Sequence, residues 1–403
     1  MSHSPVAPGQ AAEPAVTERG EISYETAARY RDAAVLMIYI EPAPYIVGFV
    51  EQVRACWRGP ITVVYVELAR SQPWGHLSRG DDEFHLAKGM LAAIRDLRRR
   101  LGARRYALLH LAGWGHPLLL AALFLARLHR TPVTIESDTP SPASSAGWKS
   151  AIKRLAYPRL FALPRIFLPG GTRQAAYLRD FGVEEARIRV AQMTVDVEHI
   201  RRRLGDRPSD VRDRFEARHG LRKGDIRILY LGRLEPHKGI EDLLQAYREV
   251  VARRPDVSLL IAGDGSLRDR VLAAQAECES IRYVGRLSGD DVWDAYCAAD
   301  IFVLPSHAEP WGLVVNEAMA AGLPVIVTDR VGCVDDLVQD GVTGLVVPAE
   351  KPDRLAAAIS RLIESSELRR VMGQRGGELI SGWTLRNQAE RTVAAWRDAL
   401  ARR

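Results

Sequence analysis

The stretch IFVLPSHAEPWGLVVNEAMAAGLPVIVTD, residues 301–329, contains a complete strand–helix–strand unit. The apolar runs at 301–304 and 325–328 are typical of short buried strands. Between them, the residues from Gly312 to Ala321 form a plausible helix, and Gly322 follows at the left-handed cap position that commonly ends one. This unit predicts a parallel sheet with helices packed against it.

The same alternation of short apolar runs and longer helical patterns extends over most of the chain. A helix is expected at 84–100, for example, between two such runs. Parallel sheets covered by helices on both faces show this pattern, which predicts an α/β protein with two doubly wound, Rossmann-like domains. The remaining strand candidates are 33–40, 61–67, 106–111, 133–135 and 165–168 in the first half, and 226–231, 258–262, 282–284 and 345–347 in the second.

A charge-rich passage near residues 201–220 interrupts the alternation and marks the expected domain boundary. At roughly 150 residues per domain, a chain of 403 residues has room for two. The apolar residues of the last segment follow a helical pattern, and this helix either closes the second domain or crosses back onto the first. We therefore expect a flexible tail at 1–32, two Rossmann-like domains at 33–195 and 196–382, and a terminal helix at 383–403.

Composition limits the class of protein. With 47% hydrophobic and 26% charged residues the chain resembles an ordinary globular protein, which excludes a wholly disordered or collagen-like one. Its four cysteines lie far apart without a C-x-x-C pair, as expected for a reducing compartment. The longest apolar stretch, 118–126, is far shorter than the roughly 20 residues of a spanning helix, and the first residues lack a signal-peptide core. We expect a cytoplasmic protein, with or without peripheral contact at the inner face of the membrane.

The net charge of +6 is mildly basic, but the basic residues cluster. Such clusters form either solvated helix faces or a patch for an anionic membrane surface or a phosphate-bearing substrate. The sequence lacks zinc-finger, homeodomain and aromatic RNA-binding signatures, which argues against a nucleic-acid partner. The clustered residues are Arg95, Arg98, Arg99, Arg100, Arg104 and Arg105, and then Arg201, Arg202 and Arg203.

The expected helix at 312–321 begins where a parallel strand ends, at the sheet edge where ligands collect. Free N–H groups and the positive end of the helix dipole make this a site for an anion such as a diphosphate. Glu309 precedes the helix and Glu317 lies within it, and carboxylates accept hydrogen bonds from sugar hydroxyls. The ordinary alternative is that Glu309 is a loop charge and Glu317 a solvated helix residue.

Two further segments follow strands of the second domain. Arg233 and Lys238, in GRLEPHKGI, place positive charges at the same sheet edge, suited to a departing diphosphate or simply exposed to solvent. The GDG at 263–265 lacks the third glycine of a dinucleotide fingerprint, which disfavours a nicotinamide enzyme. Gly285 offers a tight turn that either passes backbone groups to a nucleotide base or is a plain structural turn.

Together, GRLEPHKGI, LLIAGDG, YVGR, AADIFVLPS and EPWGLVVNEAMAAGLPVIVTD resemble the family 4 retaining glycosyltransferases, which have the two-domain GT-B fold. The resemblance is strong from about residue 226 to 348 and only an outline in the first half. It implies two domains that face each other across a central cleft, with the acceptor bound by the domain at 33–195 and the nucleotide-sugar donor by the domain at 196–382. It also implies transfer of a hexose-type sugar from a nucleotide diphosphate sugar to a hydroxyl acceptor, with retained anomeric configuration, front-face substitution and no metal ion. The sequence also has no convincing D-x-D pair for a metal-bridged diphosphate.

The resemblance also implies a role for each residue that matches a family motif. Glu309 would contact hydroxyls of the donor sugar, and Glu317 the nucleotide ribose. Arg233 and Lys238 would bind the diphosphate, and with Glu309 they form the expected catalytic set. The backbone amides of Gly312 and Leu313 would meet the phosphate and sugar, and Gly285 with Arg286 would lie near the base.

The first half departs from the family pattern. The segment YIEPAPYIVGF, residues 39–49, lacks the paired glycines that many members place near the donor phosphate. Where many members have a histidine, this chain has Glu136 and Asp138, which would orient an acceptor hydroxyl or accept its proton, unless Ser137 or Asp138 merely caps a helix. Further candidates for acceptor contact are His110 and His116, although histidines beside apolar runs are more often structural.

The predicted activity is therefore that of a retaining, metal-independent glycosyltransferase, with the nucleotide diphosphate sugar as co-substrate and no further cofactor. The acceptor is either a small molecule or lipid-linked, as in polysaccharide, glycolipid or secondary-metabolite biosynthesis. A nucleotide-sugar epimerase or hydrolase on the same fold remains an alternative, because a fold does not determine function. So does a catalytically silent nucleotide-sugar-binding protein.

Overall fold

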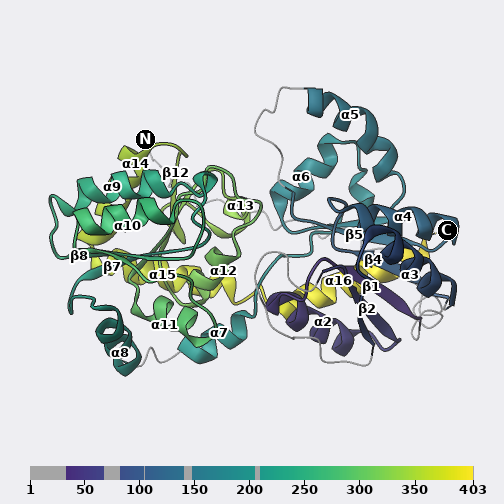
Figure 1. The fold of residues 1–403 in the computed structure, drawn as a ribbon, viewed down its shortest axis with the longest axis horizontal. Helices are drawn as coiled ribbons and strands as arrows, with labels where there is room; N and C mark the ends of the chain where they lie inside the picture. The colour runs from purple at the N-terminus through teal and green to yellow at the C-terminus, as the bar shows by residue number, and fades with distance from the viewer. Residues whose placement is uncertain (1–32, 68–81, 104, 140–147, 205–208, 403) are drawn as a thin grey trace, which may run out of the picture.

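The computed structural model describes residues 33–67, 82–103, 105–139, 148–204 and 209–402. The expected N-terminal tail at 1–32 lies outside these residues. The described chain forms two lobes side by side, each built around one sheet (Figure 1). The first lobe contains β1 (Val35–Tyr39), α2 (Pro44–Cys56), β2 (Ile61–Tyr65), β3 (Glu83–His85), α3 (Met90–Ala103), β4 (Leu108–Leu111), α4 (Pro117–Leu128), β5 (Val133–Ser137), α5 (Trp148–Phe161), β6 (Ile166–Pro169), α6 (Thr172–Asp180) and the 3-10 helix η1 (Glu185–Arg187).

The rest of the chain forms the second lobe and the terminal helix. Its sheet is framed by helices in the same way as the first. The elements are α7 (Val197–Leu204), α8 (Ser209–His219), β7 (Ile226–Leu231), the 3-10 helix η2 (Pro236–Lys238), α9 (Ile240–Val251), β8 (Val257–Ala262), α10 (Arg268–Glu277), β9 (Ile281–Tyr283), α11 (Asp290–Ala298), β10 (Ile301–Leu304), α12 (Leu313–Ala320), β11 (Val325–Thr328), α13 (Val334–Leu337), β12 (Gly344–Val347), α14 (Pro352–Glu364), α15 (Ser366–Ile380) and α16 (Leu385–Ala401).

Both sheets have six parallel strands with the same order of connection. The first runs β3-β2-β1-β4-β5-β6 and the second β12-β11-β10-β7-β8-β9. In each sheet the chain winds outward in one direction, then returns to the centre and winds in the other. The switch points, between β1 and β4 and between β10 and β7, are where ligands bind in doubly wound sheets. The predicted fold class, an α/β protein with two doubly wound, Rossmann-like domains, is confirmed.

The central strands are buried on both faces, which explains why their sequences are continuous apolar runs. The predicted strands agree with the structure to within two residues at either end.

The helix predicted at 84–100 is wrong at its beginning. Phe84 instead lies in the edge strand β3, paired with Val64 of β2, and α3 begins only at Met90 after Gly89, which has a φ of +93°. A three-residue edge strand is too short to give a periodic signal.

The terminal helix α16 lies in the first lobe, although the chain reaches it from the second (Figure 1). Thr384 caps it by accepting a hydrogen bond from the Asn387 N–H at 3.0 Å. Its apolar face packs on α2, with the fully buried Trp396 edge-on to Trp57 at 5.7 Å between ring centroids. The chain therefore crosses between the lobes twice, and the second crossing completes the core of the first lobe.

Candidate functional site

Loops that follow β7 and β10 form the centre of the candidate site, on either side of the switch point in the second sheet. Lys238, in the loop after β7, donates a hydrogen bond to the carboxylate of Glu309, in the loop after β10. Their side chains are only 11% and 12% exposed. The structure thus brings together two of the residues expected to be catalytic. A cation and an acceptor of sugar hydroxyls lie side by side at a ligand-binding edge.

Glycines allow these loops to approach one another. Gly239 has a φ of +70°, and a Cβ there would lie 2.0 Å from the carbonyl oxygen of Pro305 in the β10 loop. In the GDG segment, a Cβ on Gly263 would lie 1.8 Å from the carbonyl oxygen of Gly232. The GDG segment therefore supports the loop that carries Arg233 and Lys238. This close approach requires a glycine at position 263, whether or not a dinucleotide binds there.

Helix α12 begins at Leu313, shortly after Glu309 in the chain. Gly312 is its N-cap, has a φ of +97°, and has no side chain to satisfy the first amides. A Cβ at this position would meet Leu304 and Val331 at 3.1 and 3.0 Å. The N–H groups that begin with Leu313 thus lie at the ligand-binding edge of the sheet, beside Glu309. An anion held there would interact with the positive end of the helix dipole.

Glu317 lies one turn into α12 and is half-buried. Its carboxylate accepts a hydrogen bond from the Tyr296 hydroxyl of α11 at 2.7 Å. Burial raises the pKa of Glu317 to about 7, and the Tyr296 hydrogen bond opposes this rise only in part. The carboxyl group is neither a plain surface charge nor a permanently ionised one. Its ability to accept hydrogen bonds from a ligand depends on pH near neutrality.

The remaining donor-side candidates occupy more open positions. Arg233 and Arg286 are exposed, while Gly285 has a φ of +71° and its carbonyl accepts a hydrogen bond from the Gly263 N–H at 2.8 Å. The guanidinium of Arg286 lies 3.9 Å from the Asp264 carboxylate. All the loops after β7, β8 and β9 therefore meet at one edge. The structure places the donor-side candidates at the same edge of the sheet as Lys238 and Glu309.

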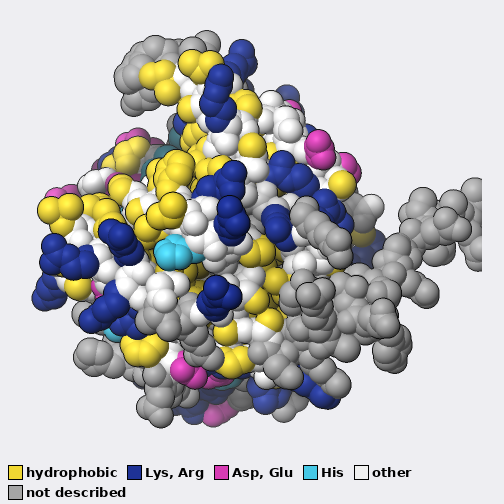
Figure 2. Space-filling view, turned by 90° about the vertical axis from the view of Figure 1, so that its right-hand side faces the viewer, with side chains coloured by type: hydrophobic (Ala, Val, Ile, Leu, Met, Phe, Trp, Pro, Cys, Tyr) yellow, Lys and Arg dark blue, Asp and Glu magenta, His cyan; other side chains and the backbone are white. Residues whose placement is uncertain are grey.

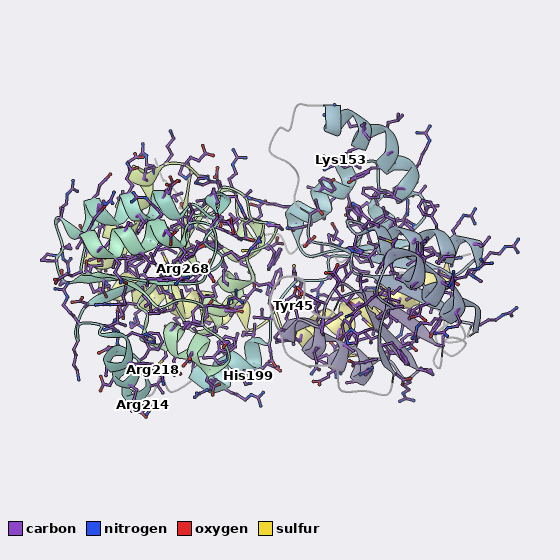
Figure 3. All side chains as sticks on the ribbon, viewed as in Figure 1. Tyr45, Lys153, His199, Arg214, Arg218 and Arg268 are labelled. Carbon is purple, nitrogen blue, oxygen red and sulfur yellow. The ribbon has the colours of Figure 1, made fainter. Side chains whose placement is uncertain are left out.

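A cavity of about 180 Å³ lies at the corresponding switch point of the first lobe. The loops after β1, β4, β5 and β6 line it, together with residues of the first crossing between the lobes. Tyr45, on its wall, lies on the side of the first lobe that faces the second (Figure 3). Glu136 and Asp138 line the cavity as well, and burial raises the pKa of Asp138.

The two histidine candidates have structural contacts. His110 is fully buried, and its ring contacts Thr134 Oγ1 at 2.9 Å and Glu136 Oε1 at 3.1 Å. His116 caps α4 by accepting a hydrogen bond from the Leu118 N–H at 3.2 Å. Neither is among the described residues that line the cavity. Ser137 ends strand β5, and no described helix begins at Ser137 or Asp138, so the helix-cap interpretation is wrong.

The cavity adjoins helix α12 through contacts that the sequence did not reveal. Asn316 of α12 donates a hydrogen bond to the carbonyl of Met193, a cavity residue, at 3.3 Å. It also accepts one from the indole of Trp311 at 3.0 Å. A Cβ on Gly170, another lining residue, would lie 3.6 Å from the Trp311 ring. The fully buried Trp311, which belongs to the same loop as Glu309, therefore packs against the wall of the cavity.

Helix α6 of the first lobe also contacts the second lobe. Arg173 forms a two-pronged ion pair with Asp335 and donates to the carbonyls of Asp329 and Val331. Val331 is bridged in turn to the backbone of Glu309. The sequence did not indicate a role for Arg173, because an arginine near a helix start carries no local signal of a contact across domains.

Within the described ranges, no three or more histidine, cysteine or acidic side chains are grouped so that they could hold a metal ion. The four cysteines, all of which are described, are free thiols. Of the helices in the described part of the chain, none is long and apolar enough to cross a membrane.

Comparison with protein families matches both halves of the chain. Residues 27–194 match the family described as "Glycosyl transferase 4-like domain". Residues 211–378 match the family described as "Glycosyl transferases group 1". Between them, these matches include every candidate site residue of both lobes.

Curated relatives point the same way. The chain is 31% identical over 261 residues to a D-inositol 3-phosphate glycosyltransferase of Rhodococcus erythropolis, covering 62% of this chain and 55% of that protein. It is 27% identical over 320 residues to an alpha-D-kanosaminyltransferase of Streptomyces kanamyceticus, covering 73% of this chain and 77% of that protein. The chain therefore matches only about half the length of the first relative.

A solved structure shares the fold over nearly the whole chain. The crystal structure of Anabaena HepE in complex with UDP and glucose superimposes with a TM-score of 0.70 at 16% identity, covering 90% of this chain and 98% of that one. At this identity the similarity establishes the arrangement of two sheets. It does not establish the substrate.

Proposed function

The chain belongs to the family 4 glycosyltransferases, and on that premise we propose that it moves a hexose-type sugar from a nucleoside diphosphate to an acceptor hydroxyl with retained anomeric configuration. The observation that carries the proposal is the contact of Lys238 with Glu309 at the switch point, beside the start of α12. A diphosphate cation and a sugar-hydroxyl acceptor are the two groups that a nucleotide-sugar site requires.

The proposed step breaks the bond between the anomeric carbon and the diphosphate oxygen and forms one between that carbon and the acceptor oxygen. The nucleoside diphosphate leaves with the bonding electrons and takes up the acceptor's proton on the face where the acceptor enters. Lys238, Arg233 and the first amides of α12 stabilise the negative charge that develops on the diphosphate. Glu309 holds the sugar, while Glu317 contacts the ribose and Gly285 with Arg286 lies near the base.

In this proposal the protein positions the two substrates, and its fixed cations and amides stabilise the charge on the leaving group. The reaction then requires no cofactor and no metal ion. The acceptor binds in the cavity of the first lobe, where Glu136 and Asp138 orient its hydroxyl. His110 acts on the acceptor only through Glu136, which it contacts.

We expect Lys238→Ala and Glu309→Ala each to reduce sugar transfer by about a hundredfold or more, because each removes a group that acts on the departing diphosphate or the sugar. The assay measures transfer from a radiolabelled nucleotide sugar to acceptor. Lys223→Ala and Glu367→Ala are matched controls, since these side chains are 82% and 69% exposed elsewhere on the second lobe. Unchanged transfer in a folded Lys238 or Glu309 variant would refute that residue's role.

The same assay separates the alternative activities. An epimerase would convert the donor sugar without an acceptor, a hydrolase would release free sugar, and a silent binding protein would do neither.

A thermal-shift comparison of UDP, GDP, ADP and dTDP, with and without magnesium, identifies the donor base, because a ligand that binds only the native state raises the melting temperature. A shift that requires magnesium would contradict the metal-independent mechanism.

The protein also has a surface suited to an anionic bilayer, and we propose peripheral membrane contact there. Exposed apolar side chains on α3, α4 and α5 lie among arginines and lysines on the outer face of the first lobe, which Figure 2 views directly. Apolar groups insert at the headgroup boundary while basic groups attract anionic lipids. The largest exposed apolar side chains of these helices are Leu91, Leu128, Leu155, Phe124, Ile152 and Met90.

A further inference from the structure

Helix α6 of the first lobe lies next to α13 of the second (Figure 1), and two consecutive side chains of α6 reach into the second lobe. The amide nitrogen of Gln174 donates a hydrogen bond to the Pro310 carbonyl at 2.6 Å. Arg173 donates one to the Val331 carbonyl at 3.1 Å. Pro310 directly follows Glu309 in the chain. The first lobe therefore contacts the backbone beside the carboxylate that is proposed to hold the donor sugar.

These two side chains hold both members of a pair of loops. The loop at 309–311 lies beside the loop at 330–333, and three backbone hydrogen bonds join them. The bonds run from the Glu309 N–H to the Arg330 carbonyl (3.3 Å), from the Gly332 N–H to the Glu309 carbonyl (2.9 Å) and from the Cys333 N–H to the Trp311 carbonyl (3.0 Å). Gln174 contacts the first loop and Arg173 the second. A displacement of α6 would therefore displace both loops, and Glu309 with them.

The lobes approach each other so closely at the start of α6 that there is no room for a side chain. A Cβ on Gly171, the N-cap of this helix, would lie 2.4 Å from the Asp336 carboxylate and 2.5 Å from the Trp311 ring. The N–H and the hydroxyl of Thr172 both donate to the Asp336 carboxylate, at 2.9 and 2.7 Å. Helix α6 therefore begins at a fixed position against the second lobe, from which its next two side chains reach the paired loops.

Stability alone does not account for a glutamine at position 174. The Gln174 side chain is fully buried, and its amide oxygen has no hydrogen-bond partner among the described residues. A buried amide with one end unpaired adds little net stability, and an apolar side chain of the same size would fill the space as well. The paired end, in contrast, is directed at the carbonyl that follows Glu309. The placement of this loop explains the glutamine better than the strength of the contact between the lobes.

We infer that Gln174, together with Arg173, is a positioning residue for sugar transfer: from the first lobe it holds Glu309 where this carboxylate contacts the donor sugar. The inference rests on the proposed function, in which Glu309 holds the sugar. Neither side chain touches a substrate in this role, because both act through Glu309. The lobe that binds the acceptor thus also sets the geometry of the donor sugar, and contact at α6 aligns the two substrates.

The first test replaces Gln174 by methionine, which keeps the size of the side chain and removes the donor to Pro310. We expect kcat for transfer to fall by about tenfold or more, because a small displacement of a positioned group lowers the rate strongly. The melting temperature should change by no more than about 2 °C, since little net stability is lost. Arg173→Met, which removes the donor to Val331, should lower kcat in the same way.

Binding measurements separate this role from a general loss of structure. The probes are whichever of UDP, GDP, ADP and dTDP raises the melting temperature, and the glucose conjugate of that nucleotide. In Gln174→Met, the affinity for the nucleoside diphosphate should change by less than about twofold, while the affinity for the glucose conjugate falls, because Glu309 contacts the sugar and not the nucleotide. A general loss of structure would weaken both.

A double-mutant cycle tests whether Gln174 acts through Glu309. In a Glu309→Ala background, Gln174→Met should lower the residual transfer by less than about twofold, because the group that it positions is already absent. Thr172→Val is the matched control, since it removes another hydrogen bond between the lobes, to Asp336, without contacting either loop. It should leave kcat and both affinities unchanged.

Failure of the inference can be told apart from failure of the proposed function. Unchanged kcat in Gln174→Met, or an equal fall with and without Glu309, would overturn the inference and leave the transfer reaction in place. Loss of the fold in Gln174→Met would also overturn it, by showing that the residue is a stabilising contact. If Glu309→Ala transfers sugar as well as the wild type does, the role of Glu309 in the proposed function fails instead.

Discussion

At the residue scale, Glu317 shows how surroundings change the chemistry of a side chain. In sequence it is one of many glutamates on a helix, and the ordinary expectation is a solvated charge. In the fold it is half-buried against Tyr296, and burial raises its pKa to about 7. A group that titrates near neutral pH makes the donor site sensitive to pH.

We expect the affinity for the nucleoside diphosphate to fall as pH drops below about 7, by up to about tenfold per unit, because the protonated carboxyl no longer accepts two ribose hydrogen bonds. Titration calorimetry from about pH 8 to about pH 6 would measure this fall. In Glu317→Gln the slope should be absent. An equal slope in that variant would assign the titration to another group.

The raised pKa of Glu317 also affects folding, and here stability falls rather than rises with increasing pH. The native state binds this proton more tightly than the unfolded state, so the stability that it contributes is complete below the ordinary pKa of 4.5 and is lost as pH rises through about 7. Glu317→Gln should therefore gain stability relative to the wild type over that interval. Chemical denaturation at the two ends of the interval provides the comparison.

At the element scale, glycines allow the loops of the proposed donor site to approach one another closely. The turn at Gly239 ends η2 with a φ of +70° and begins α9 directly. The Pro305 carbonyl occupies the space that a side chain at this position would need. This contact sets the distance between the loop that carries Lys238 and the loop that carries Glu309.

We expect Gly239→Ala to destabilise the protein by about 1–3 kcal/mol and to weaken nucleotide binding, because it adds a clash with the Pro305 carbonyl to the strain of a positive φ. Gly182→Ala is the control for strain alone, since its φ is +81° but a Cβ there has no neighbour within 4 Å. Thermal unfolding and calorimetry measure the two effects. Equal losses in both variants would show that the clash contributes nothing.

At the scale of the whole molecule, two lobes with sheets of the same topology lie side by side (Figure 1), and the terminal helix connects the second lobe back to the first. Helix α16 belongs to the first lobe in space and follows the second lobe in sequence. Arg173 contacts Val331, whose backbone is bridged to that of Glu309, and Asn316 contacts Met193 from helix α12, which carries Glu317. A movement of one lobe would therefore displace the residues of the proposed donor site, as in enzymes that close around their substrates.

The outer face of the first lobe gives a prediction at the same scale. In flotation with vesicles, the protein should bind membranes that contain anionic lipid and not neutral ones, and roughly half a molar of salt should reduce the binding. Replacing Leu128, Leu155 and Phe124 by serine should weaken binding with little effect on folding, because these side chains are 73%, 68% and 58% exposed. Equal binding to neutral vesicles, or none to anionic ones, would contradict the proposal.

The sequence by itself determined the two parallel sheets, their strands, and the candidate residues at their ligand-binding edges. These features depend on local patterns: apolar runs long enough to be buried on both faces, and polar or glycine residues directly after them. The short strand β3 was not predicted, because three residues are too few to show an alternating hydrophobic pattern. The resemblance to known glycosyltransferases rested on the same motifs.

Only the tertiary structure decided which of these residues are in contact. Lys238 contacts Glu309, Glu317 is half-buried against Tyr296, and the rings of His110 and His116 contact Glu136 and the Leu118 N–H outside the cavity lining. The cavity of the first lobe likewise draws its walls from four separated loops and a crossing segment. Contacts between residues distant in the chain depend on side-chain packing across the whole fold, and no local pattern records them.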